Sequence, residues 1–189
     1  MYTIPSRQFL AQIQKFEGFY AQPYLCPAGK VTIGYGTNLE AHPENIPYND
    51  LRKAVENKIL YGNALLLALK KRGMQWTKQQ AESNMLVEVL TTREDLEKRC
   101  PAYISLVARD EMVRAEALLD MAYNMGVGTA PRGTEKGRGL LGFFTFLPRM
   151  ERGEYEAAAA GLKRSSWYKQ VGRRSRTICE QIRTGAYCD

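Results

Sequence analysis

The sequence of 189 residues has little histidine, little cysteine and no long apolar run, and each shortage argues against a class of protein. Its one histidine, His42, lies in a polar loop beside Pro43, and we interpret it as a solvated side chain. A Ser-His-Asp or Cys-His mechanism would need this residue. The longest aliphatic run, residues 64–69, is far too short to span a bilayer. Histidine-based triads and membrane-spanning proteins are therefore poor descriptions of this chain.

Cysteine occurs at four positions, Cys26, Cys100, Cys179 and Cys188, without a CxxC pair. Four cysteines are too few for a disulfide scaffold, and their spacing does not suit a structural zinc site. We expect Cys179 and Cys188 to be free thiols, with a bridge between them as the alternative in an oxidising compartment. The sequence suggests neither a metal nor an organic cofactor.

The first residues lack the charged start and the apolar stretch of a secretory signal. We therefore expect synthesis in the cytoplasm without a signal peptide. Any action outside the cytoplasm then depends on another route of release.

Acidic residues are scarce in the last third of the chain. The whole sequence has 27 basic and 20 acidic residues, which gives a net charge of +7. Residues 131–189 hold twelve basic and six acidic residues, so this segment carries +6 of the net charge. Such a surface attracts polyanions: nucleic acid, anionic lipid or acidic polysaccharide. Charge alone does not choose among them, but no nucleic-acid-binding module is recognisable, so we do not expect a nucleic-acid partner.

Apolar spacing predicts an α+β chain that is predominantly helical. Ser6 and Thr77 are expected to be N-caps, and Gln80 completes a capping box with Thr77. Residues 115–125 are apolar on nearly all sides, which indicates a central buried helix. Residues 131–139 form a basic, glycine-rich stretch that we interpret as a mobile connection. The expected helices cover residues 6–16, 49–72, 77–98, 110–125, 143–150, 154–164 and 173–183.

A short β-hairpin is expected directly after the first helix. That helix should end at Glu17, because Gly18 accepts the left-handed turn that ends many helices. Residues 24–26 and 31–36 are the expected strands, joined by a turn, since apolar residues alternate with small or polar ones from residue 31 onward.

Three chemistry-bearing side chains would converge where this helix meets the hairpin. Glu17 stands at the helix end, Cys26 on the first expected strand and Thr32 on the second. Phe16 and Phe19 would partly wall off the carboxyl group, and desolvation favours its protonated form. We therefore expect Glu17 to act as a general acid, while the Thr32 hydroxyl orients a water molecule.

At these residues the sequence resembles the phage-type lysozymes of glycoside hydrolase family 24. The active site of that family is a glutamate, eight residues, an aspartate, five residues and a threonine, followed by Ile-Gly-x-Gly. Here Glu17, Cys26, Thr32 and the segment 33–36 keep this spacing with one substitution.

The resemblance extends over most of the chain. Residues 122–126, Ala-Tyr-Asn-Met-Gly, are similar to the end of the family's central helix. Residues 165–168 and 183–187 are similar to its Ser-Arg-Trp-Tyr segment and its C-terminal Arg-Thr-Gly motif. Residues 38–76 contain what looks like an insertion into a single lysozyme-like domain over residues 1–189.

The resemblance implies a role for each matching residue. Glu17 would protonate the glycosidic oxygen, and Thr32 would help to place the attacking water. Arg174 aligns with an arginine that pairs with the catalytic glutamate, although Arg173 and Arg176 lie close by in the sequence. Asn124 matches a position that contacts bound sugar.

Cys26 is the departure from the family pattern. The aspartate of the family accepts a proton from water or stabilises positive charge on the sugar. A thiol can do this only as a thiolate, and an ordinary cysteine is mostly protonated at neutral pH. Our hypothesis is a working thiolate; the alternatives are a passive group beside a sufficient glutamate, or a sign of lost activity.

The implied fold has a small N-terminal β-hairpin lobe and a larger helical lobe. The implied activity is hydrolysis of the β-1,4 bond between N-acetylmuramic acid and N-acetylglucosamine in peptidoglycan, with inversion and without a cofactor. We expect a monomeric phage endolysin that reaches the periplasm through a holin, and whose basic last third faces an anionic cell wall or envelope. The alternatives are a toxin delivered by a secretion system, the lysozyme domain of a larger tail protein, or an inactive wall-binding module.

Overall fold

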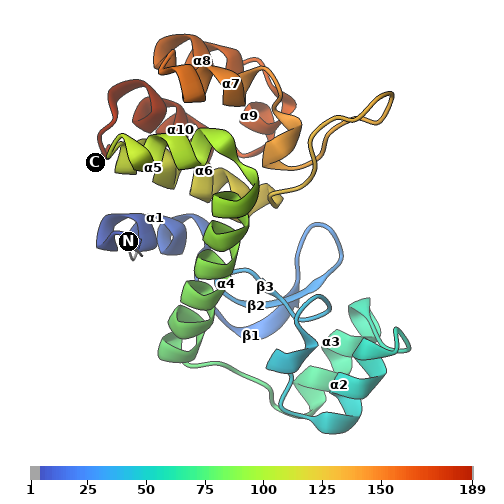
Figure 1. Ribbon diagram of the computed structural model, residues 1–189. Helices are drawn as coiled ribbons and strands as arrows, with labels where there is room; N and C mark the ends of the chain where they lie inside the picture. Colours follow the sequence, from blue (N-terminus) through green and yellow to red (C-terminus); the bar gives the residue numbers. More distant parts are fainter. Residues whose placement is uncertain (1–4, 189) are drawn as a thin grey trace. The chain divides into compact units, whose positions relative to one another are not determined.

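The structure, a computed structural model, describes residues 5–188. The chain divides into two compact units, which we describe separately. The β unit comprises Leu10–Val87, and the helical unit comprises the described parts of Met1–Phe9 and Glu88–Asp189. Two helices, α1 (Arg7–Glu17) and α4 (Lys78–Arg99), run from one unit into the other (Figure 1).

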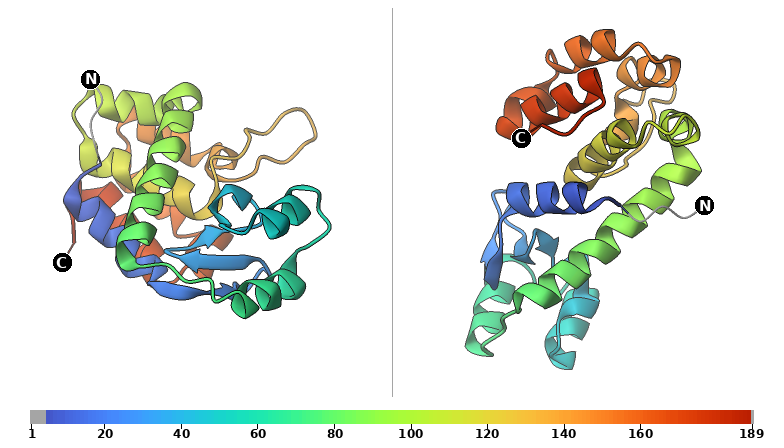
Figure 2. Two further views of the ribbon diagram at one scale, coloured as in Figure 1. Left: turned by 90° about the horizontal axis from the view of Figure 1, so that it is seen from below. Right: turned by 90° about the vertical axis from the view of Figure 1, so that its left-hand side faces the viewer.

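The β unit is built on a small antiparallel sheet of three strands in the order β1-β2-β3. The strands are β1 (Tyr20–Leu25), β2 (Val31–Gly34) and β3 (Thr37–Asn38). All four residues of β2 are buried because this strand lies between the other two. The 3-10 helix η1 (Pro43–Asn45) and the helices α2 (Asn49–Glu56) and α3 (Gly62–Lys71) follow in the chain, and α3 packs on β1 and β2 (Figure 2).

An apolar core joins the sheet to these helices. Its members come from β2, from the segment that follows β3, from α2 and α3 and from the segment that follows α3; they are Val31, Ile33, Leu39, Ile46, Val55, Leu65, Leu66, Leu69 and Met74. Burying a side chain of this kind stabilises a fold by about 1.5–3 kcal/mol. The expected insertion therefore contributes much of the core on which β2 rests.

The helical unit contains the rest of α4 and six further helices. These are α5 (Pro101–Ala108), α6 (Met112–Met125), α7 (Phe146–Arg152), α8 (Tyr155–Leu162), α9 (Ser166–Gln170) and α10 (Arg173–Thr184), with the 3-10 helix η2 (Leu140–Gly142) before α7. Helix α6 is buried from Ala115 to Ala122 and contacts α5 and α10, which confirms the expected central helix. In the described part of the chain, no helix is both long and apolar enough to cross a membrane.

Both ends of the described chain are attached to α6 through Glu116. This carboxylate is 5% exposed and accepts hydrogen bonds from the Ser6 backbone N–H at 2.6 Å and from the Ser6 hydroxyl at 2.9 Å. The Tyr187 hydroxyl also donates to Glu116 and lies 3.1 Å from the Ser6 hydroxyl oxygen. Because a buried carboxylate needs such donors, the two ends of the chain are held at one point.

The expected helix caps are confirmed. Ser6 accepts a hydrogen bond from the Phe9 N–H at 3.1 Å. Thr77 and Gln80 form the capping box, with Thr77 N–H to Gln80 Oε1 at 2.8 Å and Gln80 N–H to Thr77 Oγ1 at 3.2 Å. Gly18 ends α1 with a φ of +69°.

Other expected boundaries are wrong. The single helix over residues 49–72 is divided into α2 and α3, because Lys58 and Gly62 adopt positive φ angles of 58° and 54°. Pro101 begins a helix, α5, because proline is well tolerated at a first helical position. Over residues 129–138, isolated bridges pair Thr129 with Arg138 and Arg132 with Glu135, and the expected mobility of residues 131–139 stays a prediction.

Candidate active site

Glu17 is the last residue of α1 and lies against the turn that follows β2. A Cβ atom placed on Gly36 would stand 3.1 Å from Oε2 of Glu17. Gly36 also has a φ of +93°, which an L side chain rarely adopts. Glycine at this position therefore serves two needs: the turn conformation and the close approach of the half-buried carboxyl group.

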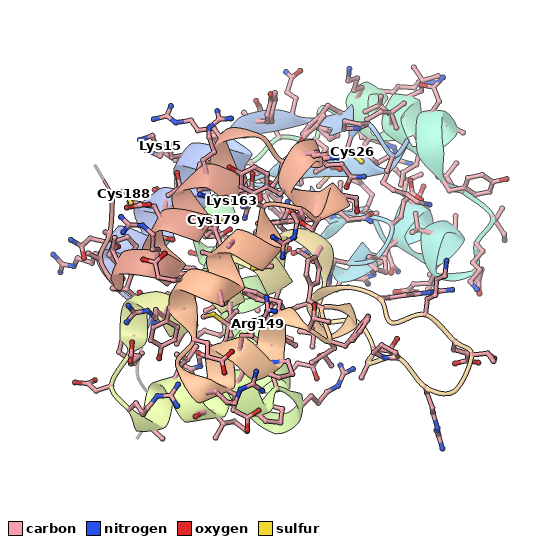
Figure 3. The ribbon with its side chains drawn as sticks, turned by 90° about the horizontal axis from the view of Figure 1, so that it is seen from above. Lys15, Cys26, Arg149, Lys163, Cys179 and Cys188 are labelled. Atoms are coloured by element: carbon pink, nitrogen blue, oxygen red, sulfur yellow. The ribbon has the colours of Figure 1, made fainter. Side chains whose placement is uncertain are left out.

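Cys26 lies in the turn between β1 and β2 and not on the first strand, where we expected it, because β1 ends at Leu25. Its N–H donates to the Lys30 carbonyl at 2.9 Å, and its own carbonyl accepts from the Gly29 N–H at 2.8 Å. These two bonds close a tight loop over residues 26–30. The sulfur is half-buried at the head of that loop (Figure 3).

The loop surrounds the Cys26 sulfur with donors. Burial acts to raise the pKa of the thiol, but hydrogen bonds from the backbone N–H groups of Lys30 and Ala28 and from the Thr32 side chain outweigh burial, so the pKa is lowered. Hydrogen bonds to the charged form are a general cause of such shifts. The thiolate is therefore more abundant here than at an ordinary cysteine.

Thr32 is a 4%-exposed residue of β2. Its hydroxyl donates to the Lys30 carbonyl at 3.1 Å, and it also acts to lower the pKa of the Cys26 thiol. A hydroxyl has one proton to donate. When Cys26 ionises, the hydroxyl of Thr32 can turn its proton from the Lys30 carbonyl to the sulfur. The orientation of the Thr32 hydroxyl then depends on the protonation state of Cys26.

Tyr24 is a site residue that sequence reasoning missed. It pairs with Thr32 across β1 and β2. Burial raises the pKa of its phenol, and the charges of Tyr20, Glu17 and Cys26 raise it further. The phenol thus lies within electrostatic reach of both Glu17 and Cys26, and its raised pKa favours the neutral form. Only the strand register could have revealed it.

Glu40 is the second residue that the sequence did not reveal. It accepts hydrogen bonds from Lys30 Nζ at 2.9 Å, the Val31 N–H at 3.2 Å and the Gly62 N–H at 3.0 Å. Burial acts to raise the pKa of this carboxyl, but these donors outweigh burial and lower it. Glu40 therefore attaches the end of the Cys26 loop to the start of α3.

Two further expected site residues lie in the helical unit, and their expected roles stay predictions. Arg174 is buried and donates through Nε to Oδ1 of Asp120 on α6 at 2.6 Å. Asn124 is exposed at the end of α6, and its Oδ1 accepts from the Trp167 indole N–H at 3.0 Å. Trp167 is 5% exposed, as expected of a core residue, and His42 contacts Glu44 at 3.1 Å in an exposed loop.

The β unit thus holds three groups: the carboxyl group of Glu17 at the end of α1, the Cys26 thiol with its lowered pKa in the turn before β2, and the Thr32 hydroxyl on β2. A carboxylic acid can give a proton to a leaving oxygen, and a thiolate can accept one from water. The two group types that general acid and base chemistry needs are therefore available in this unit without histidine. In a comparison with known families, the sequence matches the phage lysozyme family over residues 14–181, a range that contains all five expected site residues.

Proposed function

Because the chain belongs to the phage lysozyme family, we propose that it hydrolyses the β-1,4 bond between N-acetylmuramic acid and N-acetylglucosamine in peptidoglycan. Family membership supports a glycoside hydrolase that acts on bacterial cell wall. The observation that carries the finer proposal is the arrangement of the β unit: Glu17 lies against the turn after β2, and Cys26 lies in the hydrogen-bonded turn before β2, the strand of Thr32. The lowered pKa of the Cys26 thiol supports its role as the acceptor, in place of an aspartate.

In the proposed reaction, Glu17 gives its proton to the glycosidic oxygen while the bond from that oxygen to the anomeric carbon breaks. A water molecule attacks this carbon from the opposite face, and its proton passes to the Cys26 sulfur. The Thr32 hydroxyl positions the water. The product then has the inverted configuration, which is the outcome of a mechanism with a base-activated water.

The proposed biological role is lysis of a bacterial host. A phage lysozyme made in the cytoplasm would reach the wall after release through a holin. The basic last third of the chain would then meet anionic wall or envelope polymers.

The test is digestion of purified murein followed by mass spectrometry of the fragments. The wild type should release fragments with muramic acid at the reducing end, and Glu17→Gln should reduce this release by about 10²–10⁴-fold, since it removes the acid. Unchanged digestion by Glu17→Gln would overturn the proposal. The anomeric configuration of the first product, read by proton NMR, tests inversion.

A further inference from the structure

A pocket lies within the β unit, and its lining includes none of Glu17, Cys26 and Thr32. The pocket has a volume of about 770 Å³ and is lined by residues of η1, the segment 47–48, the segment 73–76 and the first turns of α4. Pockets of roughly 300–1,000 Å³ are typical of sites for small ligands. We call it the amide pocket.

The walls of the amide pocket combine aromatic rings with carboxamide side chains. Trp76 and Tyr48 supply the rings. The amides are those of Asn45, Gln75, Gln79, Gln80 and Asn84. Each amide offers both donors and acceptors, and an indole or phenol offers an apolar face with a polar edge. A ligand that fits this lining has apolar faces and neutral groups that both donate and accept.

The charge of the pocket differs from that of the chain. The protein carries a net charge of +7, but among the described residues that line the pocket the one charged side chain is Glu44. A site for phosphate, anionic lipid or nucleic acid would need cations. The lining therefore favours a neutral, hydroxyl-rich and amide-bearing ligand.

Several walls of the pocket are held in place before any ligand binds. The Trp76 backbone N–H donates to the Ala21 carbonyl at 2.8 Å, and a Cβ on Gly34 would lie 2.9 Å from Cε3 of the indole. The Tyr48 hydroxyl donates to the Arg72 carbonyl at 2.7 Å. Asn84 Nδ2 donates to Thr37 Oγ1 at 2.8 Å. Such preorganisation reduces the entropy that binding would cost.

Part of the pocket lining faces solvent. Gln75, Gln79 and Ser83 are exposed, and Trp76 is half-buried. A rigid aromatic wall with exposed amides around it can stack against a sugar ring and hydrogen-bond its substituents. An N-acetylhexosamine has these features: an apolar C–H face, hydroxyl groups and an acetamide.

We propose that the amide pocket is a second saccharide site, which binds one N-acetylhexosamine unit of a glycan strand. The inference rests on the proposed function, because peptidoglycan presents such units along every strand. One strand bound in this pocket keeps the enzyme on the polymer between cleavage events. Trp76 also packs on Gly34 of β2, the strand that carries Thr32, so the pocket and the candidate catalytic strand share one scaffold.

The experiment uses full-length protein that carries Glu17→Gln, so that saccharides bind without turnover. Chitotriose is titrated into isotopically labelled protein while NMR follows the Trp76 indole N–H and the Gln79 side-chain amide. Cellotriose, which lacks the acetamide groups, is the ligand control. We expect saturable shifts of both signals with chitotriose at a Kd of about 1 mM, as for a shallow site of modest area, and much smaller shifts with cellotriose.

Variants of exposed residues separate the pocket from any other saccharide site. Gln75→Ala with Gln79→Ala should weaken chitotriose binding at the Trp76 signal about tenfold, the loss expected from about 1.4 kcal/mol of hydrogen bonding. Gln8→Ala, a matched change at an exposed position of α1, should leave binding unchanged. These substitutions avoid Trp76→Ala, which would remove packing against Gly34.

Three results would overturn the inference: no shift at Trp76 and Gln79, equal shifts with cellotriose, or equal affinity in the Gln75 and Gln79 variant. Failure of the proposed function would show elsewhere, as wild-type protein that releases no muramic-acid ends from murein. Binding in the pocket is measured with Glu17→Gln protein, so the two proposals fail independently.

Discussion

Cys26 and Cys179 lie in different surroundings, which shift the pKa of the thiol in opposite directions. Cys26 lies half-buried in a loop of the β unit, among N–H and O–H donors, and its pKa is lowered. Cys179 is buried in α10 of the helical unit near Lys163 (Figure 3). Burial raises the pKa of Cys179 to about 11, although the Lys163 charge acts to lower it.

The difference shows which feature makes a thiol useful. At Cys179 burial outweighs the charge of the neighbouring lysine, whereas Cys26 is less buried and the hydrogen bonds to its sulfur outweigh burial. The extent of burial and the hydrogen bonds to the sulfur together set the direction in which each pKa is shifted. At Cys26, the backbone of the turn and the Thr32 side chain are what lower the pKa of the thiol.

The largest contrast should appear on removal of each thiol. Cys26→Ala should lower murein hydrolysis by about 10²–10⁴-fold, the loss typical of a missing base. Cys179→Ala should leave activity unchanged, because this thiol is buried outside the candidate site. Full activity in Cys26→Ala would refute a catalytic thiolate. Cys26→Asp should retain activity, and the pH at which its activity rises should be lower than in the wild type.

Alkylation should separate the two thiols without mutation. At neutral pH, iodoacetamide should modify Cys26 at least about 100-fold faster than Cys179, because only the thiolate reacts and only Cys26 is accessible. Exposed Cys188 serves as an internal reference for accessibility. Peptide mass spectrometry over time gives the rates, and similar rates for Cys26 and Cys179 would contradict the lowered pKa.

Thr32→Val should make Cys26 resemble an ordinary cysteine. Loss of the hydroxyl removes a donor to the sulfur, so the thiol pKa rises and the increase of activity with pH moves to higher pH. At neutral pH we expect about a tenfold loss of activity. Thiolate absorbance during a pH titration measures the shift. Thr37→Val, a buried hydroxyl that binds Asn84, is the matched control and should leave the Cys26 titration unchanged.

The smallest effect should come from Glu40→Gln, which weakens the support of the Cys26 loop without touching the sulfur. We expect a loss of about 1–2 kcal/mol in the free energy of unfolding, since three donors lose their charged acceptor. The pKa of the Glu40 carboxyl is lower in the folded protein than in the unfolded chain, where it is near 4.3. Glu40 therefore contributes fully to the stability of the fold above that unfolded pKa, and the contribution is lost as the pH falls through the folded pKa. The variant and the wild type should therefore converge in acid.

Urea unfolding at neutral and acidic pH measures this difference. Glu44→Gln, at a mostly exposed carboxylate that contacts His42, is the control and should change stability little. An equal difference between Glu40→Gln and wild type at both pH values would contradict the assigned role.

Features determined by neighbouring residues were predictable from the sequence. The end of α1 at Glu17, the capping box of Thr77 and Gln80 and the buried stretch of α6 all follow from local spacing. The break between α2 and α3 was missed because Lys58 adopts the left-handed region, a conformation that its side chain does not signal.

The residues that surround the candidate site could not be predicted, because they are placed by strand register and by contacts between residues far apart in the sequence. Tyr24 is placed by strand register, and Glu40 binds the N–H of Gly62, 22 positions away. Arg174 binds Asp120 across 54 positions, and nothing near either residue indicates the other. Motif spacing identified groups that carry chemistry, whereas the groups that tune them are brought together only by the fold.

The attachment of Ser6 and Tyr187 to Glu116 has a consequence for the connectivity of the chain. Because the two hydroxyl groups are 3.1 Å apart, a short linker can join the backbone near Ser6 to the backbone near Tyr187 with little loss of entropy. New ends can then be opened at Gly133 and Thr134, in the exposed turn between paired Arg132 and Glu135. The fold is thus suited to circular permutation, with every element kept and only the order of synthesis changed.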